Sequence, residues 1–160
     1  MVQAQDLERI ARELSLRSQQ LRQKIVLTKR ALLDAVADIR ESVHEMQSSR
    51  SRLQWLTQIL ESLRDARDNA KNPDDLENYL NELEDWEEEE AEELEHMQFL
   101  AQEYQEMLAH RKLLMTRLVT LGRQLIQVRQ RERLLMAAAL RVGAVRLSRR
   151  KEVLCTPAKQ

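Results

Sequence analysis

The tetrapeptide Asn72-Pro73-Asp74-Asp75 is the strongest helix-start signal in this chain of 160 residues, and it decides how the chain is divided. Asparagine is a favoured N-cap residue, proline is favoured at the first helical position, and acidic side chains stabilise the positive end of the helix dipole. Pro73 is also the first proline, and no glycine precedes it. Nothing in the backbone chemistry therefore ends a first helix before about residue 71.

Apolar residues recur at alternating spacings of three and four on both sides of this signal, which is the heptad pattern of a coiled coil. We call these positions the two seams, which run from Leu7 to Leu63 and from Leu76 to Val142. Two helices of matched length joined by a short turn can pack together in antiparallel directions. We therefore predict an all-α fold, an elongated antiparallel coiled-coil hairpin. Its first helix, turn with N-cap, second helix and disordered tail are predicted over residues 2–71, 72–75, 76–150 and 152–160.

The composition favours long helices. Gly and Pro number two each, and aromatic residues make up 3% of the chain. Turns need Gly and Pro, and sheets favour aromatic and β-branched residues, so the composition argues against a β or α/β fold. The apolar content of 42% is nevertheless too high for a disordered chain.

Several functional classes find no support in the sequence. There is no glycine-rich phosphate loop, no nucleophile elbow and no zinc-binding spacing, so we expect neither an enzyme nor a cofactor. The single cysteine, Cys155, leaves no disulfide within the chain. No run of 18 apolar residues and no signal peptide are found, so we expect an intracellular protein, cytoplasmic or nuclear.

Two Glu-x-x-His motifs, Glu41 to His44 and Glu93 to His96, are the nearest approach to a metal site. Paired motifs of this kind bind two metals in some four-helix bundles. Such a site needs two further inward glutamates, and Glu41 and His44 flank the seam residue Val43 instead of pointing inward. We therefore expect no metal.

The net charge of -1 conceals a strong segregation of charge. Residues 1–70 contain 12 Lys and Arg against 10 Asp and Glu, residues 71–110 contain 1 against 15, and residues 111–160 contain 13 against 2. The three segments carry +2, -14 and +11, respectively. This pattern predicts one acidic region and one basic end, which bear on partners and not on the fold.

The polar residues that interrupt the seams test the hairpin. With a turn near residues 71 and 72, residue i faces about residue 143 - i. Three interruptions then meet opposite charge, in the pairs Glu93 with Arg50, Glu132 with Arg9 and Arg12, and Arg111 with Asp34. We therefore prefer the hairpin to its alternative, a long parallel dimer.

The run from Glu82 to Glu95 contains ten carboxylates in fourteen residues. It includes an acidic tip that consists of Glu87, Glu88, Glu89 and Glu90. A solvated helix face is one interpretation. Glu90 and Glu93 fall on seam positions, however, where a carboxylate weakens packing unless a cation lies opposite. The facing helix could supply that charge from Arg50, Arg52, Arg64 and Arg67, and otherwise the stretch would receive a basic partner.

Apolar residues outside the seams predict a further neighbour. They surround most of the helix circumference near residues 113–115 and 134–140, which is more than one neighbouring helix can cover. A hairpin supplies only one neighbour, so we expect other coiled-coil subunits to complete a multi-chain helical bundle. The residues predicted to bind them are Leu113, Met115, Leu134, Met136 and Leu140.

The C-terminal part is basic, and a basic helix can bind nucleic acid, anionic lipid or an acidic protein surface such as tubulin. We do not expect nucleic acid to be the partner, and single-stranded nucleic acid is least favoured because no aromatic residues are interleaved for stacking. Thr156 precedes a proline and forms a proline-directed kinase site, whose phosphorylation would weaken an electrostatic contact there. The residues predicted to dock on an acidic surface are Arg141, Arg146, Arg149, Arg150 and Lys151.

These features favour a non-enzymatic structural subunit that assembles with other helical chains in a cytoskeletal, spindle or centromere-type complex. A stalk or chaperone-like regulator of a hexameric ATPase is an alternative. In length and hairpin plan the chain is similar to the stalk proteins of flagellar and type III secretion ATPases, although no motif matches them. A homodimeric tethering coiled coil is the third hypothesis.

Overall fold

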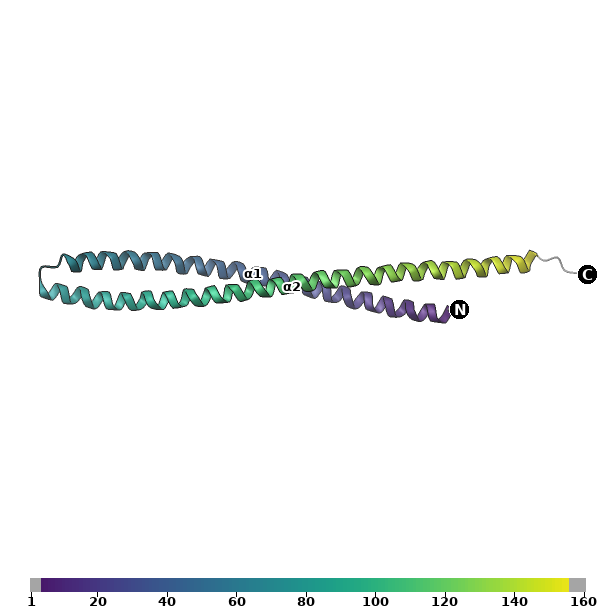
Figure 1. Ribbon diagram of the computed structural model, residues 1–160, viewed down its shortest axis with the longest axis horizontal. Helices are drawn as coiled ribbons and strands as arrows, with labels where there is room; N and C mark the ends of the chain where they lie inside the picture. Colours follow the sequence, from purple (N-terminus) through teal and green to yellow (C-terminus); the bar gives the residue numbers. More distant parts are fainter. Residues whose placement is uncertain (1–3, 156–160) are drawn as a thin grey trace, which may run out of the picture. The chain divides into compact units, whose positions relative to one another are not determined.

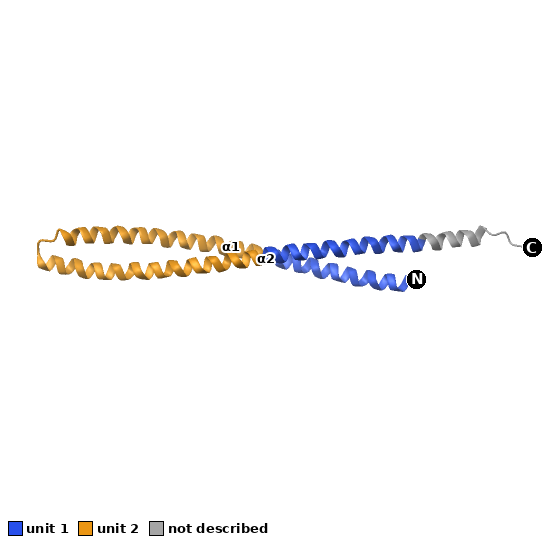
Figure 2. Ribbon diagram, viewed as in Figure 1, with its two compact units in different colours: residues 1–31, 114–160 blue, residues 32–113 orange. Residues whose placement is uncertain are grey.

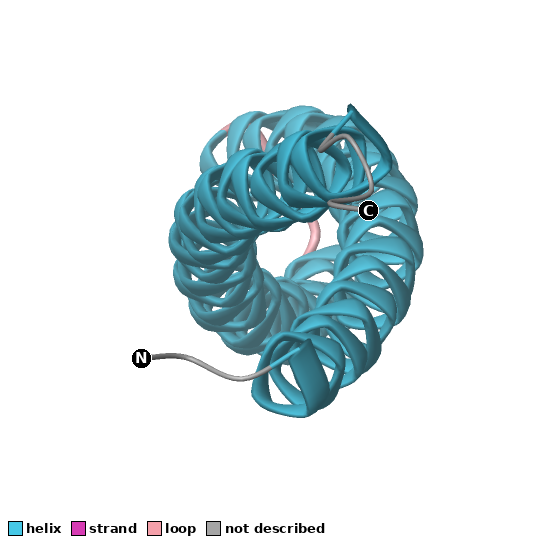
Figure 3. Ribbon diagram, turned by 90° about the vertical axis from the view of Figure 1, so that its right-hand side faces the viewer, coloured by secondary structure: helices cyan, strands magenta, loops and turns pink. Residues whose placement is uncertain are grey.

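Two long α-helices make up the structure, a computed structural model that describes residues 4–155 and, for side chains, residues 4–143. Helix α1 spans Ala4–Asp68 and helix α2 spans Pro73–Cys155, with 65 and 83 residues (Figure 1). Residues 69–72 connect them, and no strand occurs in the described part of the chain (Figure 3). The chain is an all-α helical hairpin, as the sequence predicts.

The start of α2 confirms the capping signal. The side-chain oxygen of Asn72 accepts a hydrogen bond from the Asp74 amide at 3.0 Å. The Asn72 carbonyl accepts from the Leu76 amide at 3.1 Å, which is the first bond of the helical ladder. Pro73 occupies the first helical position, where its missing N–H is not needed. Asn72 is therefore the N-cap.

The end of α2 differs from the prediction. The predicted tail begins at residue 152, but α2 remains helical through Cys155. Residues 144–155 contain neither Gly nor Pro, so nothing in that stretch interrupts the backbone ladder. The rest of the predicted tail, 156–160, lies outside the described residues.

The chain divides into two compact units (Figure 2). Unit 1 combines residues 1–31 with residues 114–160, and unit 2 comprises residues 32–113 and contains the turn. In each unit a stretch of α1 lies beside an antiparallel stretch of α2 (Figure 2). The hairpin is predicted by the sequence, whereas this division is not.

The core of unit 2 is built from leucines at seam positions. Leu56, Leu60 and Leu100 are the largest fully buried side chains, and Leu83 is buried as well. Burying one such side chain stabilises the fold by about 1.5–3 kcal/mol. Pairing of the seams is therefore the main source of stability in this unit.

Small residues occupy buried positions in the middle of α1. Ala35, Ser42 and Ser49 recur at intervals of seven residues, and all three are buried. The predicted seam includes Val43 at this level, but the structure buries Ser42 and leaves Val43 half-buried. A small side chain on α1 leaves room for a long one on α2 when two helices interdigitate.

The pairing of the helices in unit 2 lies close to the predicted register. Ser49 bonds to Glu93, one residue from the predicted position, and Trp55 packs against Trp86, two residues from it. The two tryptophan rings are T-shaped, with centroids 5.6 Å apart and planes at 85°. This edge-to-face geometry is favourable for aromatic pairs.

Unit 1 has a separate apolar core. Leu21 from α1 packs with Leu121 and Val128 from α2, and all three are buried. Leu14, Ile25 and Leu125 flank this cluster. Every one of these residues belongs to a predicted seam, so the heptad pattern identifies the cores of both units.

Candidate interaction surfaces

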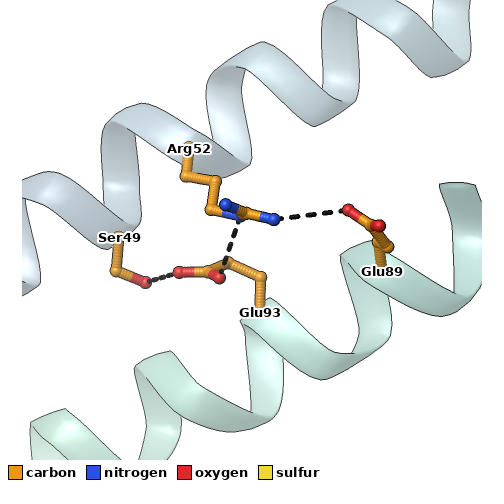
Figure 4. Close-up of polar contacts among 4 residues, drawn as sticks. All are labelled: Ser49, Arg52, Glu89 and Glu93. Carbon is orange, nitrogen blue, oxygen red and sulfur yellow. Dashed lines mark hydrogen bonds and ion pairs between the residues drawn. The ribbon is translucent and has the colours of Figure 1, made fainter.

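A polar network crosses the helix interface of unit 2 at Glu93 (Figure 4). The Ser49 hydroxyl donates to Glu93 Oε1 at 2.6 Å, and Arg52 Nε lies 3.3 Å from Glu93 Oε2. Arg52 Nη2 also reaches Glu89 Oε2 at 3.3 Å. The Glu93 side chain is only 15% exposed, so both of its oxygens find partners where little water reaches them.

The prediction that Arg50 pairs with Glu93 is wrong. Arg50 is exposed and makes no ion pair among the described residues. It follows the buried Ser49 by one residue, which turns its side chain about 100° away from the seam. Arg52 follows Ser49 by three residues and therefore shares its face of the helix.

The remaining arginines of α1 contribute unequally to neutralising the acidic run. Arg64 Nη2 lies 3.5 Å from Glu87 Oε1, and both side chains are about half exposed. Arg67 pairs with its own neighbour Asp68 and not with α2. Exposed pairs of this kind contribute about 0–1 kcal/mol each. Of the four predicted cations, Arg52 and Arg64 reach the acidic run.

Much of the acidic tip faces solvent. Glu87 and Glu89 have the arginine partners given above, whereas Glu88 and Glu90 form no ion pair within the described residues. Glu88 is exposed, and Glu90 is half-buried at its seam position. The tip is therefore an acidic surface of unit 2 that α1 neutralises only in part.

Two other predicted charge pairs do not form. Glu132 makes no ion pair with Arg9 or Arg12 in the described part of unit 1, and Arg111 makes none with Asp34 in that of unit 2. Arg9, Arg12, Asp34 and Arg111 are exposed, and Glu132 is half-buried. Asp34 lies two residues beyond the seam position Leu32, and this spacing turns it away from α2.

The apolar residues predicted to bind a partner are all exposed. Leu134 is 72% exposed, and Leu113, Met115, Met136 and Leu140 are each more than half exposed. Leu113 belongs to unit 2 and the other four belong to unit 1. No contact with α1 covers them, so they are available to another helix.

Further exposed apolar residues lie outside the set predicted to bind a partner. Val119, Ile126, Leu80 and Leu94 are each about half exposed on α2. Apolar spacing alone does not predict them, because charged residues or a glycine interrupt the row in which they lie. They occupy positions spaced alternately by three and four residues, and each position is one residue C-terminal to a seam position. This spacing is the sequence signal that would have identified them.

An open groove of about 520 Å³ lies between the helices of unit 1, close to their outer ends. Its walls include the seam residues Leu7, Leu135 and Ala139, which we expected to be packed. Ala4 and Ala11 of α1 also line it, and such small side chains do not fill the space between the helices. The seam therefore remains open at this end.

The predicted basic end is only partly described. Arg141 is an exposed residue of α2. The structure places residues 144–155 in the helix but does not describe their side chains, and Thr156 lies outside the described residues. Four of the five residues predicted to form the basic end therefore have side chains that the structure does not describe: Arg146, Arg149, Arg150 and Lys151.

The two Glu-x-x-His motifs are not brought together as metal ligands. Glu41, His44 and His96 are exposed, and Glu93 is engaged by Ser49 and Arg52. Among residues 4–143, whose side chains are described, no three His, Cys, Asp or Glu side chains gather as metal ligands would.

Comparison with protein families, curated proteins and solved structures finds no match to this chain. In the part of the chain that the structure describes, neither helix has a segment apolar enough over sufficient length to cross a bilayer.

Proposed function

We propose that this chain is a non-enzymatic structural subunit that packs against other helical chains in an assembly of cytoskeletal, spindle or centromere type. The observation that supports it is the exposure of large apolar side chains on α2 of unit 1. Met115, Leu134, Met136 and Leu140 are each more than half exposed there, although α1 already covers the seam.

Physical chemistry favours a protein partner for this surface. Soluble monomers seldom expose contiguous apolar patches beyond a few hundred Å², and larger ones mark interaction sites. A helix with apolar residues on two faces is typical of a helix that has two neighbours. α1 is one neighbour, and a helix of another chain is the second.

The basic end is proposed to dock on an acidic surface such as tubulin. Arg141 is exposed, and ten further Lys and Arg residues lie between residues 114 and 160, against two Asp and Glu. Clustered exposed charge acts within about a Debye length, roughly 8 Å at physiological salt. Replacing Arg146, Arg149, Arg150 and Lys151 by Glu should abolish this docking and leave helicity and subunit assembly intact.

Affinity purification followed by mass spectrometry tests the subunit proposal. The full chain should recover other helical chains in stoichiometric amounts, and the variant Leu134→Gln, Met136→Gln, Leu140→Gln should lose them. A matched control, Gln127→Ala with Gln130→Ala, changes exposed polar residues of the same helix and should retain them. A wild-type chain recovered alone as a monomer would contradict the proposal.

The hairpin fold also fits the alternative of a stalk within a hexameric ATPase. In that case the same purification would recover one ATPase, and the chain would change its rate of turnover. A structural subunit would leave such turnover unchanged.

A further inference from the structure

A second row of side chains runs along α2 of unit 1, beside the seam. Each member follows a seam residue by one position, which turns it about 100° around the helix. The large apolar members are exposed, from 51% at Met115 to 69% at Leu140, so α1 leaves the row uncovered. We call it the basic row, and it consists of Met115, Val119, Gly122, Ile126, Arg129, Arg133, Met136, Leu140 and Gly143.

Gly122 lies within the basic row, in an uninterrupted stretch of helix. Glycine weakens a helix relative to alanine because it loses more conformational freedom on folding. Nothing in the described part of the chain requires it, since a Cβ at Gly122 would meet no atom within 4 Å there and its φ is not positive. A glycine beside open space suits the close approach of another helix.

The same positions of the seven-residue repeat form an acidic row on α2 of unit 2. Its apolar members Leu80 and Leu94 are about half exposed, and Glu84 and Glu87 are exposed between them. All of its charges are negative, whereas all charges of the basic row are positive. The acidic row consists of Glu77, Leu80, Glu84, Glu87, Ala91, Leu94, Gln98 and Ala101.

The two compact units carry net charges of opposite sign, as their rows do. Unit 2 contains 8 Lys and Arg against 22 Asp and Glu, a balance of -14. Unit 1 contains 18 against 5, a balance of +13. If unit 1 of one molecule binds unit 2 of a second molecule, their net charges therefore nearly cancel.

We propose that the basic row of one copy binds the acidic row of a second copy, so that two chains associate through antiparallel α2 helices. The inference rests on the proposed function, because it names the helical chain that covers the exposed face. Each dimer contains the contact twice, since each copy supplies one basic and one acidic row.

Both the charges and the sizes of the side chains in the two rows are complementary in this pairing. An antiparallel register that sets Glu87 against Arg129 also sets Glu84 against Arg133, with opposite charges in both places. The same register sets Leu94 against Gly122, Ala91 against Ile126 and Leu80 against Met136. A large side chain therefore meets a small one at two levels, and two apolar side chains meet at a third.

Charge also decides against a parallel pairing of the same helices. In register, parallel α2 helices would set Glu84 and Glu87 against their own copies, and Arg129 and Arg133 likewise. Like charges facing each other suppress an association, whereas opposite charges select orientation and partner. The apolar members supply affinity, and the charged members supply direction.

A charge exchange between the two rows tests the proposal with the full chain. Sedimentation velocity at about 100 µM, a concentration that detects micromolar dimers, should show the wild type as a dimer. The variants Arg129→Glu with Arg133→Glu and Glu84→Arg with Glu87→Arg should each dimerise at least about tenfold more weakly, because like charges then face each other. Mixing the two variants should restore a dimer, since both contacts become complementary again.

Matched controls change the same charge on other faces of α2. These are Arg117→Glu with Arg131→Glu in unit 1 and Asp85→Arg with Glu92→Arg in unit 2, and both should dimerise as the wild type does. Circular dichroism should show unchanged helicity in every variant, because the substituted side chains are exposed. Glu87→Arg also removes the ion pair with Arg64, but that pair is half exposed and contributes little to stability. If a charge reversal unfolds, Arg129→Gln with Arg133→Gln replaces it and should also weaken the dimer.

Three outcomes would overturn the pairing of two copies. They are a wild type that stays monomeric, a dimer that neither charge reversal weakens, and weakened variants that do not recover on mixing. A monomer that still recovers other helical chains from cells overturns this inference alone. A monomer that recovers none overturns the proposed function as well.

Discussion

Glu93 is a carboxylate at a seam position of unit 2, and its interactions decide whether that position weakens or stabilises the fold. The Ser49 hydroxyl holds one oxygen at 2.6 Å and Arg52 holds the other at 3.3 Å. A carboxylate with little access to water needs such donors to offset the loss of hydration. Single-residue changes at this network should therefore lower the stability of the fold by a measurable amount.

Removing the arginine should destabilise the chain. Arg52→Ala leaves a largely buried carboxylate with only one donor, and such a loss costs about 1–3 kcal/mol. Because the Arg52 side chain is 54% exposed, solvent screening places the expected loss near the lower limit, at about 1 kcal/mol. Urea unfolding measures it, with Arg50→Ala as the matched control that should change stability by less than about 0.5 kcal/mol.

Two serines at equivalent seam positions should respond with opposite signs. Ser49 donates to Glu93, whereas the buried Ser42 hydroxyl has no hydrogen-bond partner among the described residues. Ser49→Ala should cost about 1 kcal/mol, and Ser42→Ala should stabilise by up to about 1 kcal/mol because it removes an unsatisfied buried group. Equal effects of the two substitutions in thermal unfolding would show that Ser42 is also bonded.

At the scale of the helices, the Asn72 cap sets where α2 begins. Its side-chain oxygen accepts from the Asp74 amide at 3.0 Å, which satisfies one of the free amides of the first turn. Asn72→Ala should destabilise the hairpin by about 1 kcal/mol, and Asn72→Gly by only a few tenths. Asn69→Ala in the same connection is the control, and a loss as large as that of Asn72→Ala would argue against the cap.

Sequence reasoning succeeds where local chemistry decides the structure. The Asn72-Pro73 signal and the heptad spacing depend on backbone rules, so the cap and the leucine cores follow from them. It fails where the outcome depends on which face of the helix a residue occupies. Arg50 is predicted as the partner of Glu93, for example, but Arg52 is the residue that reaches it. The open groove near Leu7 was also missed, because spacing predicts contact but not whether small side chains fill the space.

At the scale of the whole molecule, the two units carry opposite charge and each exposes a row of α2 beside the seam. The exposed apolar residues at 113–115 and 134–140 are expected from the sequence. The basic and acidic rows, by contrast, are defined by the exposure of individual side chains, which the sequence does not predict. Net charge alone favours association of unlike units. The apolar members of the rows make that association specific to helices.

Disulfide formation between two differently substituted copies tests the antiparallel pairing most directly. In a Cys155→Ser background, one chain carries Glu87→Cys and the other carries Arg129→Cys. The antiparallel dimer predicts a disulfide-linked pair only when the two chains are mixed under mild oxidation, because residues 87 and 129 then face each other. Disulfide-linked pairs that form in either chain alone, with none added on mixing, would contradict it and indicate a parallel association.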